Sequence, residues 1–345
     1  MGSIEETVDV IPTIDLTPWL NDDDSSAAAR IAVVKELHDA CVTYGFFQLV
    51  GHGIPLQLQK KVLSCAANFF DLPLEEKMNV SIKKCMGRAN RGYEVLQGQT
   101  LQTGALPDLK EGFFIGAEEP SDSPRAGRFL TGPNQWPESI ATADFEDPLQ
   151  AYRAGMVELA QLVLNLLALA LPSPAPSSVF DDFMTQPSGN LRLLHYPPKP
   201  SPDPEQLGCG AHTDFGGITF VLQQPETKGL EVFYPPKGTW IPVEAKENAF
   251  VANVGDLLHL WTGKYYRSAV HRVTDVGDKH RYSAPFFYNG NMDLRFFPLD
   301  GSPSMTVEEH ILGKLNASRA EQTLEKAKNI DVHRQHVNLV ATAAG

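Results

Sequence analysis

Two histidines and one aspartate have the residue types and spacing of a metal site. His212 and Asp214 occupy alternate positions in the segment AHTDF (211–215), and His271 lies farther along in AVHRV (269–273). Alternate side chains of a strand point to the same face, so His212 and Asp214 can aim an imidazole and a carboxylate at one point. Two His and one carboxylate form the facial triad of non-haem Fe(II) oxygenases. The alternative is that each residue has a capping role or is a hydrogen-bonded core residue.

A candidate carboxylate-binding pair follows the last of these residues. Arg281 and Ser283 lie at alternate positions of one apolar run, so they should face the same way. A guanidinium fork beside a hydroxyl suits bidentate recognition of a carboxylate. A strand with such an anchor, next to a strand with a metal ligand, predicts a site for a keto acid that chelates iron at one end and is held by Arg281 at the other.

The elements that must position these residues are mostly short strands. Apolar runs alternate with Gly, Pro, Asp and Asn between Leu191 and Tyr288, which predicts a jelly roll or barrel built from two sheets. The runs are LRLLHY, HTDFGGITFVLQ, LEVFY, WIPV, AFVANV, DLLHLW, SAVHRV and RYSAPFFY. Strands are also expected at 11–16, 46–50 and 112–115, and helices at 25–44, after Pro55, at 145–171 and at 307–328.

We therefore predict a mainly β fold with flanking helices, organised as one integrated unit. Its expected regions are an N-terminal helical and mixed region (1–120), a connecting loop and long helix (121–187), the β core (188–300) and a C-terminal helical tail (301–345), with the last fifteen or so residues loose. Gly255-Asp256 is interpreted as a turn rather than as an acid/base pair.

Composition excludes several classes of function. The 345 residues include 29 Lys and Arg against 42 Asp and Glu, for a net charge of −13. An acidic chain lacks the basic surface that nucleic acids and anionic membranes require. No apolar run is long enough for a membrane span, and no secretory signal is visible, so a cytoplasmic location is predicted. The four dispersed cysteines are expected to be free thiols in a reducing compartment. No obligate protein partner is evident.

Several linked motifs resemble the iron(II)/2-oxoglutarate-dependent dioxygenases of the isopenicillin-N-synthase-like family. The resemblance covers most of the chain, and the sequences of the motifs are similar to those of fungal enzymes of small-molecule biosynthesis. The motifs are IPTIDL (11–16), YGFFQLVGHGIP (44–55), LRLLHYPP (191–198), GAHTDFGGITFVLQ (210–223), VANVGDLLHLWTGKYYRSAVHRV (251–273) and RYSAPFFYNGN (281–291). The family fold is a double-stranded β-helix (jelly-roll) core wrapped by N-terminal and C-terminal helices.

The resemblance implies roles for six residues. His212, Asp214 and His271 would bind Fe(II), and Arg281, Ser283 and Tyr196 would bind the distal carboxylate of 2-oxoglutarate. The implied reaction uses Fe(II), 2-oxoglutarate and O₂, with ascorbate as a stimulant. A small organic metabolite is hydroxylated, desaturated or cyclised, and succinate and CO₂ are released.

One position departs from the family pattern. Many plant members have Asn two positions before the tyrosine, where this chain has Leu194. Family members that do not use 2-oxoglutarate also carry the Arg-x-Ser pair. An oxidase of the same fold that takes all electrons from its substrate, and a non-catalytic metabolite-binding protein, therefore remain as alternatives.

Five residues are expected at the substrate. Arg192 shares a strand face with Tyr196 and could pair with an acidic or phenolate group; the alternative is a surface arginine on an edge strand. Phe114, Phe287 and Asn289 are expected to line the pocket, although the aromatic residues could equally belong to the core. Tyr93, with the irregular 85–110 segment, could form a lid. Because the chain is acidic, Arg281 and Arg192 are expected to make the mouth of the site locally positive.

Overall fold

Two β-sheets form the centre of the molecule. The computed structural model describes residues 10–20, 27–198, 205–274 and 277–318. A large sheet has eight strands in the order β1-β2-β10-β7-β12-β5-β4-β3, and a small sheet has four in the order β6-β11-β8-β9. The large sheet comprises β1 (Thr13–Asp15), β2 (Phe46–Val50), β3 (Gly92–Glu94), β4 (Glu111–Ile115), β5 (Ser188–Tyr196), β7 (Ile218–Gln223), β10 (Phe250–Val254) and β12 (Arg281–Gly290). The small sheet comprises β6 (Cys209–His212), β8 (Leu230–Tyr234), β9 (Thr239–Pro242) and β11 (His271–Val273).

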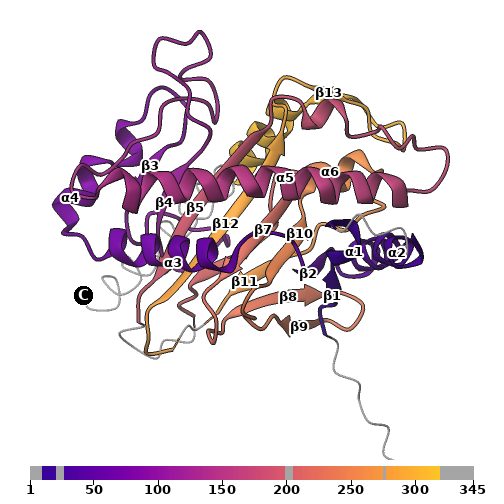
Figure 1. Ribbon diagram of the computed structural model, residues 1–345, viewed down its shortest axis with the longest axis horizontal. Helices are drawn as coiled ribbons and strands as arrows, with labels where there is room; N and C mark the ends of the chain where they lie inside the picture. The colour runs from indigo at the N-terminus through magenta and orange to yellow at the C-terminus, as the bar shows by residue number, and fades with distance from the viewer. Residues whose placement is uncertain (1–9, 21–26, 199–204, 275–276, 319–345) are drawn as a thin grey trace, which may run out of the picture.

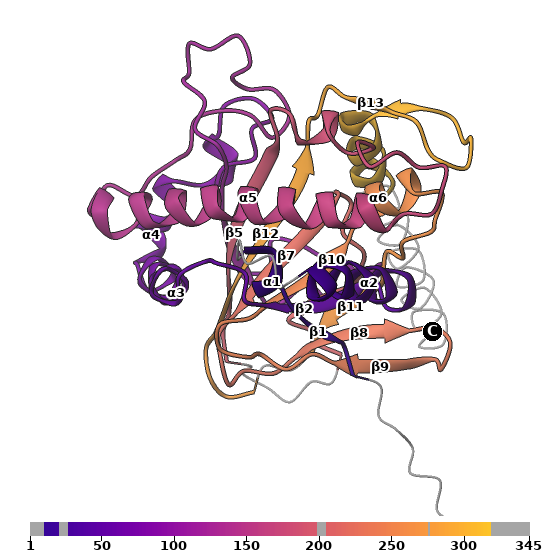
Figure 2. The ribbon, with the colours of Figure 1, turned by 45° about the vertical axis from the view of Figure 1, so that its right-hand side comes forward.

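Helices cover one face of the large sheet. They are α2 (Ala27–Thr43), α3 (Leu56–Phe70) and α5 (Glu146–Ala170), and α5 crosses the strands in Figure 1 and in Figure 2. Apolar residues of these helices and of the strands form one continuous buried cluster. The strand residues in this cluster alternate along each strand, for example Leu191 and Leu193 on β5 and Phe286 and Tyr288 on β12. This outer face of the large sheet is the main core of the protein.

The other face of the large sheet looks toward the small sheet. A second, smaller buried cluster lies between the two sheets and includes Leu194, Tyr196, Val232 and Val251. Buried polar residues share this inner face with the apolar cluster; they include Arg281 and Ser283, at alternate positions of β12, and Gln223 at the end of β7. The jelly-roll fold predicted from the short apolar runs is confirmed, with helices packed on its outside.

The structure differs from the predicted strands in three places, and the first is the run HTDFGGITFVLQ, which is divided between the end of β6 and β7. The run DLLHLW forms a helix, α6 (Asp256–Trp261), in which Leu257, Leu258 and Trp261 are buried. This spacing suits one face of a helical turn, and a short apolar run alone does not distinguish a strand from a buried helix. The run SAVHRV contributes only three residues, those of β11, to the small sheet.

Smaller elements connect and extend these layers. They are α1 (Thr17–Leu20), α4 (Leu74–Asn79), β13 (Arg295–Phe296) and β14 (Met305–Thr306). Residues 307–318 are helical, and the rest of the helix predicted for 307–328 lies outside the described residues, as does the chain end. Strands from the predicted N-terminal region join both edges of the large sheet.

The helix α5 is long and apolar enough to cross a membrane by length and composition alone. Its residues Leu149, Met156, Val163 and Leu167 are instead fully buried in the main core cluster. No other helix within the described residues meets these criteria. The four cysteines, Cys41, Cys65, Cys85 and Cys209, are all described and all free.

Candidate active site

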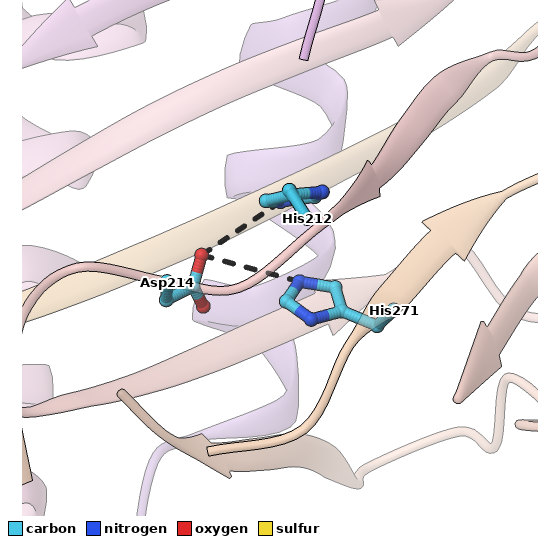
Figure 3. A group of neighbouring side chains, drawn as sticks. All are labelled: His212, Asp214 and His271. Carbon is cyan, nitrogen blue, oxygen red and sulfur yellow. Dashed lines mark ion pairs between the residues drawn. The ribbon is translucent and has the colours of Figure 1, made fainter. Parts of the chain in front are cut away.

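The three predicted metal ligands come together at one end of the small sheet. His212 ends β6 and is paired directly with His271 on β11. The Nε2 atom of His212 lies 3.8 Å, and that of His271 3.9 Å, from Oδ1 of Asp214. One potential ligand atom from each residue lies within 4.8 Å of those of the other two, so the three could hold a metal ion. Figure 3 shows both imidazole rings facing the Asp214 carboxylate.

Asp214 reaches this point by a route that the sequence did not predict. It lies beyond the end of β6, in the turn before β7, rather than on a continuous strand with His212. The turn passes very close to β12, because a Cβ atom at Gly216 would lie 1.9 Å from Asn289 Oδ1. The Asp214 carbonyl accepts a hydrogen bond from Asp256 N at 2.7 Å. Glycine and backbone hydrogen bonds therefore aim the carboxylate, in place of strand alternation.

Neighbouring groups orient each ligand. Nδ1 of His212 lies 2.8 Å from the Gly210 carbonyl, and Nδ1 of His271 lies 3.2 Å from the Ala269 carbonyl. A carbonyl can only accept, so each Nδ1 carries the proton and each Nε2 keeps a free lone pair. Asn253 Nδ2 donates to Asp214 Oδ2 at 2.8 Å. Such contacts fix ring tautomers and carboxylate orientation at metal sites.

The local electrostatics match a metal-binding state. Burial, with His212 as a neighbour, lowers the pKa of His271 to about 4, and burial also lowers the pKa of His212. Burial would raise the pKa of Asp214, but the two histidines and hydrogen bonds from Asn253 and Thr219 hold it below its usual value. Neutral imidazoles and an ionised carboxylate are the forms that bind metal. This donor set fits Fe(II).

Arg281, Ser283 and Tyr196 form a second group on the inner face of the large sheet. Arg281 is paired with Tyr196, and Ser283 with Gln223, across neighbouring strands. The guanidinium lies over the Tyr196 ring at 4.8 Å, and its Nη2 donates to Gln223 Oε1 at 2.9 Å. Among the described residues, its Nε and Nη1 atoms are buried without a hydrogen-bond partner.

A buried guanidinium with open donors is costly unless an anion binds it. The Arg281 side chain is only 2% exposed. A Cβ atom at Gly208, next to β6, would lie 3.0 Å from the Tyr196 ring, so this group adjoins the strand that carries His212. The residues present therefore fit a dicarboxylate such as 2-oxoglutarate. Sequence reasoning missed Gln223, although a polar residue at the end of an apolar strand was the available signal.

A cavity of about 450 Å³ opens beside the metal ligands. His212 and Asp214 line it, together with four of the five residues predicted at the substrate. These four are Arg192, Phe114, Phe287 and Asn289. The volume is in the range typical of small-molecule sites.

The fifth residue, Tyr93, is not at the cavity. It is 1% exposed, and its hydroxyl donates to Glu111 Oε2 at 2.6 Å on the outer face of the sheet. Lys77 Nζ also contacts this carboxylate, at 3.0 Å. Register explains the difference: Tyr93 pairs with Phe113 and points to the helices, whereas Glu94 points to the cavity. The structure therefore does not support Tyr93 as part of a lid.

Arg192 is a buried residue of an internal strand, so the interpretation as a surface arginine on an edge strand is wrong. Its guanidinium lies over the Phe114 ring at 4.3 Å and forms an ion pair with Glu94. Gln99 Oε1 lies 3.3 Å from the same guanidinium. Because Glu94 balances its charge, Arg192 does not make the mouth positive as expected, and Arg281 does not line the cavity.

Sequence reasoning missed several other cavity residues. Glu94 ends β3, Gln99 lies in the irregular segment that follows, and Asn190 lies on β5. Ile311, Leu312 and Leu315 of helix 307–318 also line the cavity. Of these residues, only Asn190 could have been predicted, from the alternation of side chains along β5. The others reach the cavity from segments that are far from β5 in the sequence.

Two family models match the chain. The N-terminal model, described as non-haem dioxygenase in morphine synthesis N-terminal, matches residues 11–139. The model of the 2OG-Fe(II) oxygenase superfamily matches residues 187–290. The second match spans both strands of the metal site as well as Arg281 and Ser283.

Individual proteins agree with these models. The 2-oxoglutarate-dependent dioxygenase tropC of Talaromyces stipitatus is 51% identical over 89% of this chain and 95% of its own length. The dioxygenase citB of Monascus ruber is 42% identical over 88% and 93% of the two chains. The structure of Neurospora crassa T7H with alpha-KG and thymine superimposes with a TM-score of 0.77 at 28% identity, covering 92% of this chain and all of the other.

These matches and the site geometry both indicate Fe(II) and 2-oxoglutarate. The His-Asp-His group suits Fe(II), and the open guanidinium suits a dicarboxylate co-substrate. The expected enzyme class, with Fe(II), 2-oxoglutarate and O₂ as reagents and a small molecule as substrate, is confirmed. The chain belongs to the Fe(II)- and 2-oxoglutarate-dependent oxygenases, a family of oxidoreductases.

Proposed function

We propose that His212, Asp214 and His271 hold Fe(II), and that Arg281, Ser283 and Tyr196 bind the distal carboxylate of 2-oxoglutarate. The enzyme oxidises a flat, oxygen-bearing metabolite of fungal biosynthesis. One observation carries the proposal: His212 and Asp214 line the same cavity as Arg192 and Phe114. A substrate held by the latter pair therefore lies beside the metal ligands.

The protein residues prepare the site for the reaction. Bound Fe(II) supplies oxygen activation, coupled to decarboxylation of 2-oxoglutarate to succinate and CO₂. The carbonyls of Gly210 and Ala269 hold both imidazole rings in the tautomer that leaves Nε2 free. Arg281 holds the co-substrate by its two open donors. Phe287 and Leu315 present apolar surface to the cavity and exclude water from the reacting carbon.

Arg192 anchors the substrate. Its Nη2 forms the ion pair with Glu94, while its Nε is buried without a partner among the described residues. That Nε–H can donate to a carboxylate, phenolate or carbonyl oxygen of the substrate. Stacking of Arg192 on Phe114 makes a flat, partly apolar floor, which favours a planar ring. The complex of the similar T7H protein with thymine, a planar heterocycle, supports this substrate class.

We also propose that the enzyme works in the cytoplasm. All four cysteines are free, and Cys41, Cys65 and Cys209 are buried. Such thiols persist in a reducing compartment.

Succinate release tests the proposed roles directly. Anaerobically purified enzyme is supplied with Fe(II), 2-oxoglutarate and air, with and without ascorbate, and with a panel of planar phenols and aromatic acids. We expect substrate-dependent succinate formation that His271→Ala abolishes. His38→Ala, a histidine on α2 that does not line the cavity, is the matched control and should retain wild-type turnover.

Two outcomes would contradict the proposal. Equal turnover by wild type and His271→Ala would contradict the assignment of His212, Asp214 and His271 as iron ligands. Selection of aliphatic molecules without a ring, in preference to planar ones, would reject the substrate class and leave the iron assignment intact.

A further inference from the structure

Asp256, interpreted from the sequence as part of a turn, links both segments that carry the proposed iron ligands. Its Oδ2 accepts a hydrogen bond from Thr213 Oγ1 at 3.1 Å, and Thr213 lies between His212 and Asp214. Its Oδ1 accepts from Ser268 Oγ at 2.7 Å, in the segment that leads into His271. The Asp256 backbone N–H donates to the Asp214 carbonyl. One buried residue thus contacts the chain on both sides of the metal site.

The same carboxylate also binds the helix that lines the cavity. Lys314 Nζ of helix 307–318 lies 2.7 Å from Asp256 Oδ2. Lys314 is about half exposed, at 46%, whereas the Asp256 side chain is 9% exposed. On the same helix, Ile311 and Leu315 line the cavity. This ion pair connects the helix to the ligand segments, in addition to a hydrogen bond between the His310 side chain and the Phe215 backbone.

The hydroxyl contacts of Asp256 and its ion pair with Lys314 differ in their physical effect. Asp256 is a nearly buried charge, so its hydroxyl donors and its ion pair must compensate for lost hydration. Removing its charge loosens Thr213 and Ser268, which hold the ligand segments. Removing Lys314 leaves those hydroxyl contacts and the core packing of Val307 and Ile311 in place, and it breaks only the link between the helix and Asp256. Because the pair is half exposed, its loss should change overall stability little.

We propose that Asp256 is a positioning residue of the iron site, and that Lys314 couples the seating of helix 307–318 over the cavity to the positions of the iron ligands. This inference rests on the proposed ligation of Fe(II) by His212, Asp214 and His271. Linkage is reciprocal: if a seated helix favours the ligand arrangement, then occupation of the metal and co-substrate sites favours a seated helix. Substrate contacts with Ile311 and Leu315 act on the iron site by the same path.

Metal affinity without turnover tests the first half. Co(II) binding to metal-free protein is measured by calorimetry for wild type, His271→Ala and Asp256→Asn. We expect Asp256→Asn to weaken Co(II) binding about tenfold, the lower range for residues that orient metal ligands. Wild-type affinity in a folded Asp256→Asn protein would overturn the positioning role. If wild type and His271→Ala bound Co(II) with the same affinity, the proposed metal ligation by His212, Asp214 and His271 would instead be rejected.

Hydrogen exchange of helix 307–318 tests the second half. Addition of Co(II) and 2-oxoglutarate should slow exchange of its amides in the wild type but not in Lys314→Met. The matched control is Lys60→Met, which removes an exposed ion pair of similar length, 2.8 Å to Glu247, and neither residue of that pair lines the cavity. Slowing in Lys314→Met equal to that in Lys60→Met would overturn the coupling. This arm decides the inference even if Asp256→Asn does not fold.

Discussion

The two faces of the large sheet have opposite tasks, and β12 shows this within neighbouring residues. Phe286 is fully buried against the helices in the main core, whereas Phe287, the next residue, lines the cavity. On β5, Leu191 and Leu193 join the same core, while Asn190 and Arg192 line the cavity. The outer face stabilises the sheet, and the inner face is where binding groups gather.

The difference shows where this fold can hold polar groups. The outer face is covered by helices, and its alternating apolar side chains need no fixed partner beyond close packing. The inner face is left open between two sheets, so guanidinium, amide and imidazole groups can be held by cross-strand neighbours. The inner groups keep open donors, as Arg281 does, because a ligand is required to complete them.

The largest expected effect is a loss of stability, and it should be much larger for a substitution on the outer face than for one on the inner face. Phe286→Ala should lower the free energy of unfolding by about 3–5 kcal/mol, since it leaves a cavity in the main core. Phe287→Ala is the matched variant on the opposite face and should cost much less stability while raising the KM for the substrate. Urea unfolding and steady-state kinetics measure both. Equal losses of stability would mean that the two faces do not divide these tasks.

The second prediction concerns two equally buried arginines. Arg281→Met should weaken 2-oxoglutarate binding by about 2 kcal/mol or more, roughly thirtyfold, because it removes the buried charge partner of the carboxylate. Stability of the free protein should hold or rise, since an incompletely paired buried charge is lost. Calorimetric titration and urea unfolding provide the readouts.

Arg91 is the control for that experiment. It is also 2% exposed, but it donates to the carbonyls of Ala89 and Leu130 and to Asn190 Oδ1. Arg91→Met should therefore destabilise the protein and leave the affinity for 2-oxoglutarate unchanged. If Arg281→Met behaved in the same way, Arg281 would be a structural residue.

A smaller effect is expected within the inner face. Arg192→Gln should raise the KM for the substrate roughly tenfold, the value of one hydrogen bond to a charged group. The KM for the co-substrate should not change, because Arg192 lines the cavity and Arg281 does not. A shift in both constants would show that the two arginines bind one ligand. Glu94→Gln combined with Arg192→Gln checks whether the unpaired Glu94 contributes to the change.

The smallest effect returns to the outer face. The Tyr152 hydroxyl on α5 is buried, and it has no hydrogen-bond partner in the described part of the chain. Burial raises the pKa of this hydroxyl far above its usual value. Tyr152→Phe should increase the free energy of unfolding by about 1 kcal/mol, since an unsatisfied polar group is removed from the core. Thermal unfolding at constant pH measures the change. A lower stability of Tyr152→Phe would show that the hydroxyl has a hydrogen-bond partner and would contradict the prediction.

Prediction from the sequence succeeded where one element carries the signal. Alternation along β12 placed Arg281 and Ser283 on one face, and Phe287 and Asn289 at the cavity. It failed for Tyr93, which was assigned to a lid with the irregular 85–110 segment. Tyr93 instead lies on the short strand β3, and its pairing with Phe113 turns the side chain to the outer face. Prediction from the sequence also assigned a strand to α6, whose apolar residues suit either structure.

The sequence by itself determined the chemistry of this protein: which residues could bind a metal and a carboxylate, and that short strands carry them. The tertiary structure decided how those residues meet. It brought Asp214 to the histidines through a glycine turn instead of a strand, paired Arg192 with Glu94, and tied Lys314 to Asp256. Periodicity reports which face a side chain occupies, whereas contacts between distant segments depend on the packing of the whole chain.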